Sequence, residues 1–330
     1  MSMTVLVTGG AGYIGSHMVL NLVDAGEKVV VIDNLSTGRD WSIHEDADLV
    51  MGDITDTYLV EQTIKQYKVD AVIHFAGSII VPESVADPLL YYSNNTAKTR
   101  NLLQAVVNSG VKHFIFSSTA AVYGDVQVEQ VFETTPKDPM SPYGRSKLMT
   151  EWMLEDTAFA HDFNYVALRY FNVAGADPKG RAGQSTPNAT HLIKVANQVA
   201  LGDRDHMEIY GTDYDTRDGT CIRDYIHVSD LTQAHYLALQ YLRAGGTSDI
   251  MNCGYGDGFT VREVLSAVKK VSGVDFEVRE VPRRAGDPPI VVANSDLAKA
   301  KLNWQPNYND LELIVKNAFD WETYLKTRNR

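Results

Sequence analysis

The first 33 residues carry the pattern that most restricts how this chain can fold. Residues 4–8 (TVLVT) are a short, β-branched apolar run, typical of a buried parallel strand. They run without a spacer into a glycine loop at residues 9–15 (GGAGYIG). Apolar residues at helical spacing follow, and residues 28–32 (KVVVI) form a second run that ends at Asp33. A strand, a glycine loop, a helix, a strand and an acid in this order predict a Rossmann-type unit.

The same pattern predicts a dinucleotide site. Glycines allow the backbone to turn tightly and approach a ligand, so that the helix N-terminus faces a pyrophosphate with free N–H groups and its positive dipole end. Asp33 lies 24 residues after Gly9, where a carboxylate accepts hydrogen bonds from ribose hydroxyls and would repel a 2′-phosphate. The expected cofactor is therefore NAD and not NADP. The glycine spacing is Gly9-x-x-Gly12-x-x-Gly15, which differs from the common G-x-G-x-x-G form.

Strand and helix signals continue to alternate as far as residue 172. Four further strands are expected from apolar runs at residues 49–51, 71–75, 113–117 and 166–170. The run at 113–117 leads directly into Ser118 and Thr119. Because open parallel sheets bind ligands at the carboxyl ends of their strands, this hydroxyl pair is expected in the site, although a turn or capping role is the commoner use of Ser and Thr.

A change of composition after Asn172 suggests a second unit. Residues 173–190 are rich in Gly, Pro, Ala and polar residues and predict a loop. We therefore expect an α/β protein with a doubly wound parallel sheet in a NAD-binding Rossmann domain of residues 1–172. A smaller mixed α/β domain of residues 173–330 would mainly bind substrate, with parts of residues 220–255 packing back on the first domain.

Charge and cysteine usage exclude several classes of function. The net charge of −12 argues against sequence-independent binding of nucleic acid or of an anionic membrane surface. No apolar run of about 18 residues is present, so no membrane span is expected. A secretory signal is not visible, and Cys221 and Cys253 are the only cysteines, which favours a reducing, cytoplasmic location. No metal site is predicted.

Tyr143 and Lys147 are the first catalytic candidates. They follow Pro139 and Pro142 and lie four residues apart, on one face of an expected helix. A protonated lysine there favours the phenolate, so the pKa of Tyr143 is expected to fall from about 10 toward the working pH. The pair would then remove a proton from an alcohol. The alternative is a chance match, since Tyr-x-x-x-Lys is common on amphipathic helices.

Motifs along nearly the whole chain resemble the extended short-chain dehydrogenase/reductase superfamily and, within it, the UDP-glucose 4-epimerases. The motifs that carry the resemblance are TGGAGYIGSH (8–17), DN (33–34), GDI (52–54), HFAG (74–77), FIFSS (114–118), SPYGRSK (141–147), RYFNVAGA (169–176), DYDTRDGTCIRDYIHV (213–228) and RRAGD (283–287). The first six are shared across many sugar-nucleotide enzymes, whereas residues 213–228 are much more specific to the epimerases.

The resemblance implies a role for each matching residue. Tyr143 would be the base, Lys147 its partner, and Thr119 the hydroxyl that bonds the sugar 4-oxygen. The expected cofactor-binding residues are Gly9, Gly12, Tyr13, Ile14, Gly15, Asp33, Asn34, Asp53, Ile54, Phe75, Ala76, Gly77, Asn94, Ser117, Tyr143, Lys147 and Tyr170. The expected substrate-binding residues are Thr119, Tyr143, Asn172, His191, Leu192, Arg223, Arg284, Asp287 and Val291.

The activity implied is NAD-dependent interconversion of UDP-glucose and UDP-galactose through a transient 4-keto sugar. A 4,6-dehydratase is disfavoured because those enzymes carry Asp-Glu after the threonine, where this chain has Ala120-Ala121. Another nucleotide-sugar epimerase is a further alternative, and a non-catalytic NAD-binding redox sensor is the alternative from another class. The resemblance also implies a homodimer, joined through helices near residues 89–107 and after residue 147.

Three positions bear on how this chain differs from its family. Ile79 stands where many members carry a lysine that contacts the cofactor, and His191 where members carry an asparagine. Val291 occupies a position that borders the sugar pocket, where bulky aromatic residues crowd a 2-acetamido group. A small residue there implies some activity on UDP-GlcNAc and UDP-GalNAc.

Overall fold

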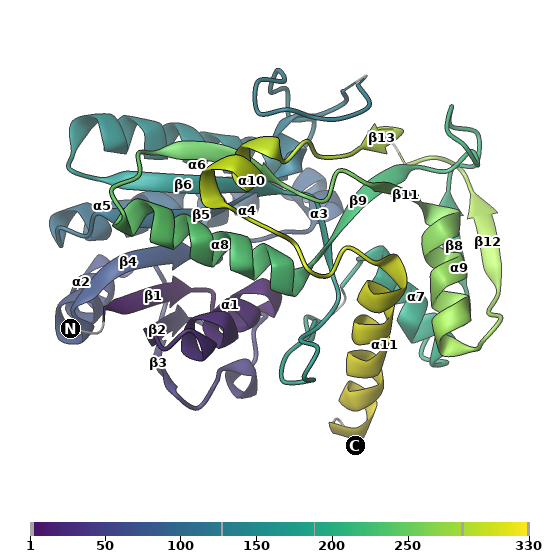
Figure 1. The fold of residues 1–330 in the computed structure, drawn as a ribbon, viewed down its shortest axis with the longest axis horizontal. Helices are drawn as coiled ribbons and strands as arrows, with labels where there is room; N and C mark the ends of the chain where they lie inside the picture. The colour runs from purple at the N-terminus through teal and green to yellow at the C-terminus, as the bar shows by residue number, and fades with distance from the viewer. Residues whose placement is uncertain (1–2, 127, 188, 285–286, 329–330) are drawn as a thin grey trace.

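The fold is built around a seven-stranded parallel sheet (Figure 1). The computed structural model describes residues 3–126, 128–187, 189–284 and 287–328. The order of the strands is β10-β6-β5-β4-β1-β2-β3, so the chain winds outward in both directions from β1. The strands are β1 (Thr4–Thr8), β2 (Lys28–Asp33), β3 (Ala47–Met51), β4 (Val69–His74), β5 (His113–Thr119), β6 (Asn164–Tyr170) and β10 (Asp249–Cys253). This confirms the predicted doubly wound α/β fold.

Helices cover both faces of the sheet because alternate strand residues point to opposite sides. In β1, Val5 and Val7 belong to one hydrophobic cluster and Leu6 to the other. The first cluster includes side chains of α1 (Tyr13–Asp24) and α8 (Val228–Arg243), which pack on each other. The second includes side chains of α2 (Thr57–Tyr67), α5 (Lys98–Asn108) and α6 (Pro142–Ala160). The near-continuous apolar strands of the sequence are thus explained by burial on both faces.

The segment between β4 and α5 is less regular than the sequence suggests. The helix expected near residues 89–107 is α4 (Pro88–Tyr91), a π-helical stretch η2 (Tyr92–Ala97) and α5 in succession, after a short α3 (Val81–Ala86). Short 3₁₀ turns, η1 (Asp40–Ser42) and η3 (Ala120–Val122), follow β2 and β5. π-helical turns often occur at functional sites, and η2 carries Asn94 and Asn95.

Much of the later part of the chain forms a second group of strands and helices, which lies beyond the carboxyl end of β1 (Figure 1). Its strands are β7 (Asn172–Ala174), β8 (Met207–Tyr210), β9 (Ile222–His227), β11 (Gly258–Thr260), β12 (Val278–Val281) and β13 (Ile290–Val291). Its helices are α7 (Leu192–Ala200), α9 (Val261–Ser272) and α11 (Leu311–Arg328). β9 pairs with β7, β11 and β13, and β8 pairs with β12. The first residues of the predicted 173–190 loop therefore belong to a strand. The sequence did not predict this strand, because β7 is only three residues long and too short to give a pattern.

Three elements that follow residue 172 lie with the central sheet. β10 pairs in parallel with β6, α8 packs on α1, β5 and β6, and α10 (Asp296–Leu302) packs on α8 and β10. One hydrophobic cluster continues from the sheet into α7, α9 and α11. The division of the chain at residue 172 remains a prediction. None of the helices in the described ranges is long and apolar enough to cross a bilayer.

Candidate active site

The loop between β1 and α1 is shaped by glycines. Gly9 has a φ of +74°, and a Cβ there would lie 2.5 Å from the Ala76 nitrogen. A Cβ on Gly15 would lie 2.1 Å from the Gly9 carbonyl oxygen. The loop therefore presses against the end of β4 and against the first turn of α1. The N-cap of α1 is Gly12, which leaves the first turn without a side-chain acceptor from the described residues. A backbone cradle at a free helix N-terminus fits the pyrophosphate of NAD.

Acidic side chains mark the ends of β2 and β3. The Asp33 carboxylate accepts from the Ala11 nitrogen at 2.9 Å and from the Leu35 nitrogen at 2.8 Å, which fixes its orientation beside the glycine loop. Each oxygen still has a lone pair for a ribose hydroxyl. The site thus fits NAD at the ribose as well as at the pyrophosphate.

Asp53 is held by two cationic or amide donors. Lys98 Nζ donates to its Oδ2 at 2.8 Å, and Asn34 Nδ2 donates to the same oxygen at 3.1 Å. Burial acts to raise the pKa of Asp53, but hydrogen bonds from Lys98 and Thr55 outweigh it and lower the pKa to about 2. Ile54, which follows Asp53, is buried. Lys98 was missed from the sequence, because a single lysine on a helix gives no signal of its partner.

The loop after β4 is tied to two helices by asparagines. Asn94 Nδ2 donates to Ser78 Oγ at 2.8 Å. The buried Asn95 accepts from the Ser78 nitrogen at 2.8 Å and donates to Ser146 Oγ of α6 at 3.1 Å. Asn95, which was not predicted from the sequence, therefore connects the loop after β4 to α6. Ile79 has 43% of its side chain exposed.

Phe75, Ala76 and Gly77 continue this wall of the site. A Cβ on Gly77 would lie 3.8 Å from Lys147 Nζ, so the end of β4 lies close to this lysine. The Phe75 ring packs 5.0 Å from the His235 ring of α8. On the loop from β1, the Tyr13 hydroxyl donates to the Gly175 carbonyl at 2.7 Å, and Ile14 packs against the sheet-side core.

The predicted catalytic residues come together at the start of α6 and the end of β5. Ser141 caps α6 by accepting from the Gly144 nitrogen at 3.2 Å, and Pro142 occupies its first turn. Tyr143, Lys147 and Thr119 are only 7%, 4% and 7% exposed. The local sequence sets the helix start, and the pairing of α6 with β5 brings Thr119 to the tyrosine.

Lys147 has a backbone partner on β5. Its Nζ donates to the Ser117 carbonyl at 2.9 Å and lies 4.9 Å from the Phe116 ring centroid. Burial lowers the pKa of Lys147 to about 8, and the Glu151 carboxylate opposes this shift. The lysine thus titrates near neutral pH instead of near its usual value.

The pKa of Tyr143 runs against the sequence-based expectation. Burial raises it, and a hydrogen bond with Thr119 opposes the rise. The expected lowering by Lys147 is wrong for this arrangement, because the phenol is withdrawn from water and the lysine Nζ donates to Ser117. Thr119 is the group that favours the phenolate here.

Ser117 and Tyr170 lie beside this pair. Ser117 Oγ donates to the Tyr170 hydroxyl at 3.1 Å and lies 3.4 Å from His235 Nε2. Burial raises the pKa of Tyr170 and lowers that of His235 to about 4, so the imidazole is neutral. His235 was not predicted, because it comes from α8, 118 residues along the chain from Ser117.

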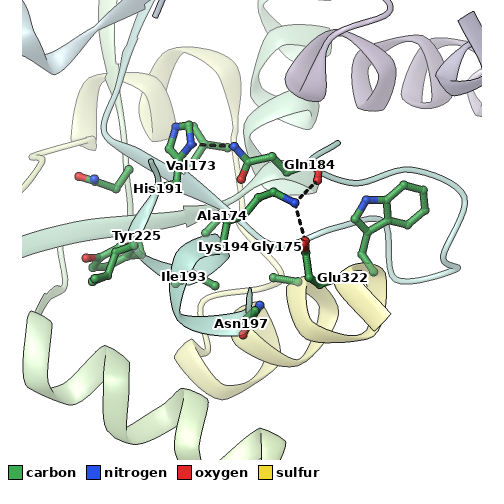
Figure 2. A pocket seen from close by; sticks show the side chains of 14 residues that line it. Val173, Ala174, Gly175, Gln184, His191, Ile193, Lys194, Asn197, Tyr225 and Glu322 are labelled. Carbon is green, nitrogen blue, oxygen red and sulfur yellow. Dashed lines mark hydrogen bonds and ion pairs between the residues drawn. The ribbon is translucent and has the colours of Figure 1, made fainter. Parts of the chain in front are cut away.

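A pocket lies between β7, α7 and α11 (Figure 2). Three expected substrate residues, Asn172, His191 and Leu192, line it. His191 Nδ1 lies 2.7 Å from Gln184 Nε2, and the side chain of His191 makes no cap bond to α7 within the described chain. Burial lowers the pKa of His191. His191 therefore forms part of the pocket wall and is bonded to Gln184.

The floor of the pocket is polar in a way the sequence did not reveal. Lys194 Nζ donates to Glu322 Oε2 at 2.5 Å and to the Gln184 carbonyl at 3.0 Å (Figure 2). Asn197, one turn further along α7, is fully buried, and both of its side-chain polar atoms lack a hydrogen-bond partner among the described residues.

The two arginines expected at a diphosphate have different partners. Arg223 forms an ion pair with Asp287, itself an expected ribose acceptor, and donates to the Pro288 carbonyl at 2.7 Å. The Arg284 guanidinium lies 3.7 Å above the ring of Tyr210, a residue that sequence analysis did not select. Residues 285 and 286 of the RRAGD motif lie outside the described residues.

Val291 borders the catalytic side of this region. It lies in β13 and packs against a small cluster that contains Ala120, Leu148 and Phe171. In the sequence, Ala120 follows Thr119, Leu148 follows Lys147, and Phe171 precedes Asn172. The neighbours of Val291 therefore adjoin residues expected on the catalytic side and on the substrate side.

Comparison with known proteins agrees with this geometry. The profile of the "NAD dependent epimerase/dehydratase family" matches residues 5–254. A UDP-glucose 4-epimerase of Azospirillum brasilense is 55% identical over 322 residues, which cover 98% of this chain and 92% of that protein. The crystal structure of a UDP-glucose 4-epimerase from Brucella ovis in complex with NAD has a TM-score of 0.94 at 44% identity, covering 97% of this chain and 98% of that one. The UDP-Glc/GlcNAc 4-epimerase from Campylobacter jejuni has a TM-score of 0.87 at 49% identity, covering 98% of this chain and 100% of that one. The chain therefore belongs to the NAD-dependent epimerase/dehydratase family, in which it is similar over nearly its full length to proteins named UDP-glucose 4-epimerases.

Proposed function

We propose that the protein interconverts UDP-glucose and UDP-galactose by inverting the sugar at C4, with NAD as its cofactor. The observation that carries this proposal is the meeting of Tyr143, Lys147 and Thr119, with Lys147 close to Gly77 of the loop after β4. Relatives that carry the name UDP-glucose 4-epimerase match nearly the whole chain, which supports the same activity.

The proposed mechanism assigns each proton to a side chain. When bound, NAD supplies the hydride acceptor, and afterwards the hydride donor, for C4. Tyr143 accepts the proton of the C4 hydroxyl, directly or through Thr119, and returns it on the other face of the sugar. Thr119 favours the phenolate of Tyr143 in the resting site, and Lys147 would stabilise the negative charge that develops while the proton moves between the sugar and Tyr143.

The nucleotide half of the substrate is the proposed anchor. Arg223 and Arg284 suit a diphosphate, since a guanidinium donates to two oxygens at once. Arg223 would exchange its partner Asp287 for phosphate oxygens, and Asp287 would then be free to accept from a ribose hydroxyl. Asn172 and the N-terminus of α7 at Leu192 complete this side, with His191 as a wall. An anchored diphosphate and a loosely held sugar allow either face of C4 to be presented.

A dehydratase is a poorer match to the site. Elimination of water needs an additional acid and base next to the hydroxyl that follows β5. Ala120 and Ala121 occupy that place and cannot exchange protons. A redox sensor needs no proton relay, whereas this site has a complete one.

Turnover of UDP-glucose tests the proposal. Purified protein with NAD is incubated with UDP-glucose, and UDP-galactose is measured by chromatography, with Tyr143→Phe as the inactive comparison. Formation of UDP-galactose by the wild type alone is expected. Absence of UDP-galactose, with NAD bound, would mean that the protein is not this epimerase.

We also propose activity on UDP-GlcNAc and UDP-GalNAc. Val291 is small and packs beside residues adjoining Thr119 and Asn172, and a UDP-Glc/GlcNAc 4-epimerase is among the similar proteins. Val291→Tyr should reduce turnover of UDP-GlcNAc while sparing UDP-glucose. Equal loss on both substrates, or none on either, would remove the proposal.

We also propose that the protein is a homodimer and that it works in the cytoplasm. Exposed apolar side chains occur on α6 and on α3–α4, which pack on it, and they support a homodimer formed through these helices. They are Val85, Leu89, Met149, Trp152 and Phe159. Cys221 and Cys253 are both free, as expected of a protein working in the cytoplasm.

A further inference from the structure

We propose that Glu151 is a positioning residue for the C4 inversion: through Ser118 it holds the end of β5 against α6, and its charge keeps Lys147 protonated. The inference rests on the proposed function, because it concerns how the same site is kept ready for proton transfer. No role was expected for Glu151 or Arg169 from the sequence, and Ser118 was expected only as one of the two hydroxyl residues at the end of β5.

The Glu151 carboxylate is fully engaged and buried. Its Oε1 accepts from Ser118 Oγ at 2.6 Å and from Arg169 Nε at 2.9 Å, and its Oε2 accepts from Arg169 Nη2 at 2.6 Å. The side chains of Glu151 and Arg169 are each 2% exposed, and Ser118 is fully buried. A bidentate pair with a third donor fixes the carboxylate in one position.

Glu151 continues the catalytic face of α6. Tyr143, Lys147 and Glu151 are spaced four residues apart, which places them in one row along the helix. Each member of the row contacts the end of β5: Tyr143 bonds Thr119, Lys147 bonds the Ser117 carbonyl, and Glu151 bonds Ser118. Ser118 lies between Ser117 and Thr119 along β5, so a displaced Ser118 would move both contacts that define the proposed proton relay.

The ion pair is anchored on its far side as well. Arg169 Nη1 donates to the Tyr123 hydroxyl at 2.8 Å, and that hydroxyl donates to Asn252 Oδ1 of β10 at 2.7 Å. The network thus spans α6, β5, β6 and β10. A buried ion pair is weak evidence for stability, since apolar residues of similar size often stabilise as much. Its position in the row below Lys147 is what points to a role in the reaction.

Other charged and titratable groups face this row from the elements packed on it. They are His74 of β4, Glu83 and Tyr91 of α3 and α4, Tyr123 and Glu133 of the segment after β5, Tyr165, Arg169 and Tyr170 of β6, and His235 of α8.

Burial keeps the histidines and tyrosines of this set uncharged. It lowers the pKa of His74 to about 3 and of His235 to about 4, and it raises the pKa of Tyr123 and Tyr165 to about 12. The pKa values of Tyr91 and Tyr170 are also raised by burial. Burial lowers the pKa of the Lys147 ammonium to about 8, and the Glu151 carboxylate favours the charged form of this lysine.

The experiment removes the charge of Glu151 while keeping its shape. In the NAD-loaded enzyme, Glu151→Gln should move the alkaline fall of kcat for UDP-glucose to lower pH by about one unit, because the ammonium loses an opposite charge nearby. The KM for UDP-glucose should stay within about twofold, since Glu151 does not touch the substrate side. Glu155→Gln, which removes an exposed carboxylate one turn further along α6, should leave the pH profile unchanged.

Two companion variants separate charge from position. Ser118→Ala keeps the charge and removes the tether, so it should lower kcat without moving the alkaline limb. Where Glu151→Gln does not fold, the double variant Glu151→Gln, Arg169→Met removes both charges from the buried site and should show a smaller shift in the same direction, because the loss of the Arg169 charge partly offsets the loss of the carboxylate. If folded Glu151→Gln keeps the alkaline fall of kcat at the wild-type pH and shows only a lower melting temperature, the proposal is overturned.

A direct titration distinguishes this inference from the proposed function. With isotope-labelled lysine, the Cε resonance of Lys147 is followed by NMR in the NAD-loaded protein and assigned with Lys147→Arg. Glu151→Gln should lower its midpoint even if UDP-glucose proves not to be the substrate. An unchanged midpoint refutes the inference, whereas a wild type that fails to form UDP-galactose refutes only the proposed function.

Discussion

Lys147 carries the charge on which the proposed proton transfer depends. Burial lowers its pKa to about 8, so the ammonium is present below that pH and is lost above it. Since the ammonium would stabilise the negative charge that develops during proton transfer, kcat should fall as pH rises through about 8. A pH profile of kcat measures this. Lys147→Arg, whose charge persists at high pH, should lose the fall near pH 8 in whatever activity remains; a fall at the same pH in that variant would assign it to another group.

Tyr143 is the residue whose loss should stop the chemistry with least change to binding. Removing a positioned general base typically costs 10²–10⁴-fold in rate, so Tyr143→Phe should lower kcat by roughly 10³-fold. The phenyl ring fills the same buried space, and NAD affinity measured by calorimetry should be nearly unchanged. Retained turnover would identify another base.

Asn197, which lines the pocket, is buried in a way that should lower the stability of the protein. Its buried amide has neither a donor nor an acceptor partner in the described part of the chain, and an unsatisfied buried polar group costs about 1–3 kcal/mol. Asn197→Leu should therefore raise the melting temperature, as measured by calorimetry. A lower melting temperature would show that the amide gains a partner in solution.

At the scale of elements, the β1–α1 loop is the most constrained connection. Gly15→Ala would place a Cβ 2.1 Å from the Gly9 carbonyl, so the loop must move away from the geometry that suits a pyrophosphate. NAD binding should weaken at least 10-fold, a loss of about 1.4 kcal/mol. Gly26→Ala is the matched control at the other end of α1. It has a φ of +80° and meets no heavy atom of the described chain within 4 Å, so it should cost stability and leave NAD affinity intact.

On the surface of the whole molecule, α6 and α4 expose large apolar side chains to solvent. Trp152 is 53% exposed and Phe159 96% exposed on α6, and Leu89 of the adjacent α4 is 76% exposed. An exposed apolar surface of this kind typically marks an interface. If the proposed homodimer uses it, Trp152→Glu should shift the mass measured by light scattering from dimer to monomer. Tyr324→Glu, an equally drastic change on α11, should leave the mass unchanged. A dimer that survives Trp152→Glu would place the interface elsewhere.

The sequence by itself determined what depends on neighbours along the chain. The β1–α1–β2 unit, the glycine loop, Asp33 and the helical row of Tyr143 and Lys147 follow from patterns within about 35 residues, where backbone preference and strand or helix period decide the outcome. Only the tertiary structure decided which groups face one another. Lys98 beside Asp53, His235 beside Ser117, and Arg169 beside Glu151 join separate segments, and nothing in their local sequence encodes the partner. The direction of the Tyr143 pKa was mispredicted for the same reason: spacing gives proximity to Lys147, but burial is a property of the packed molecule.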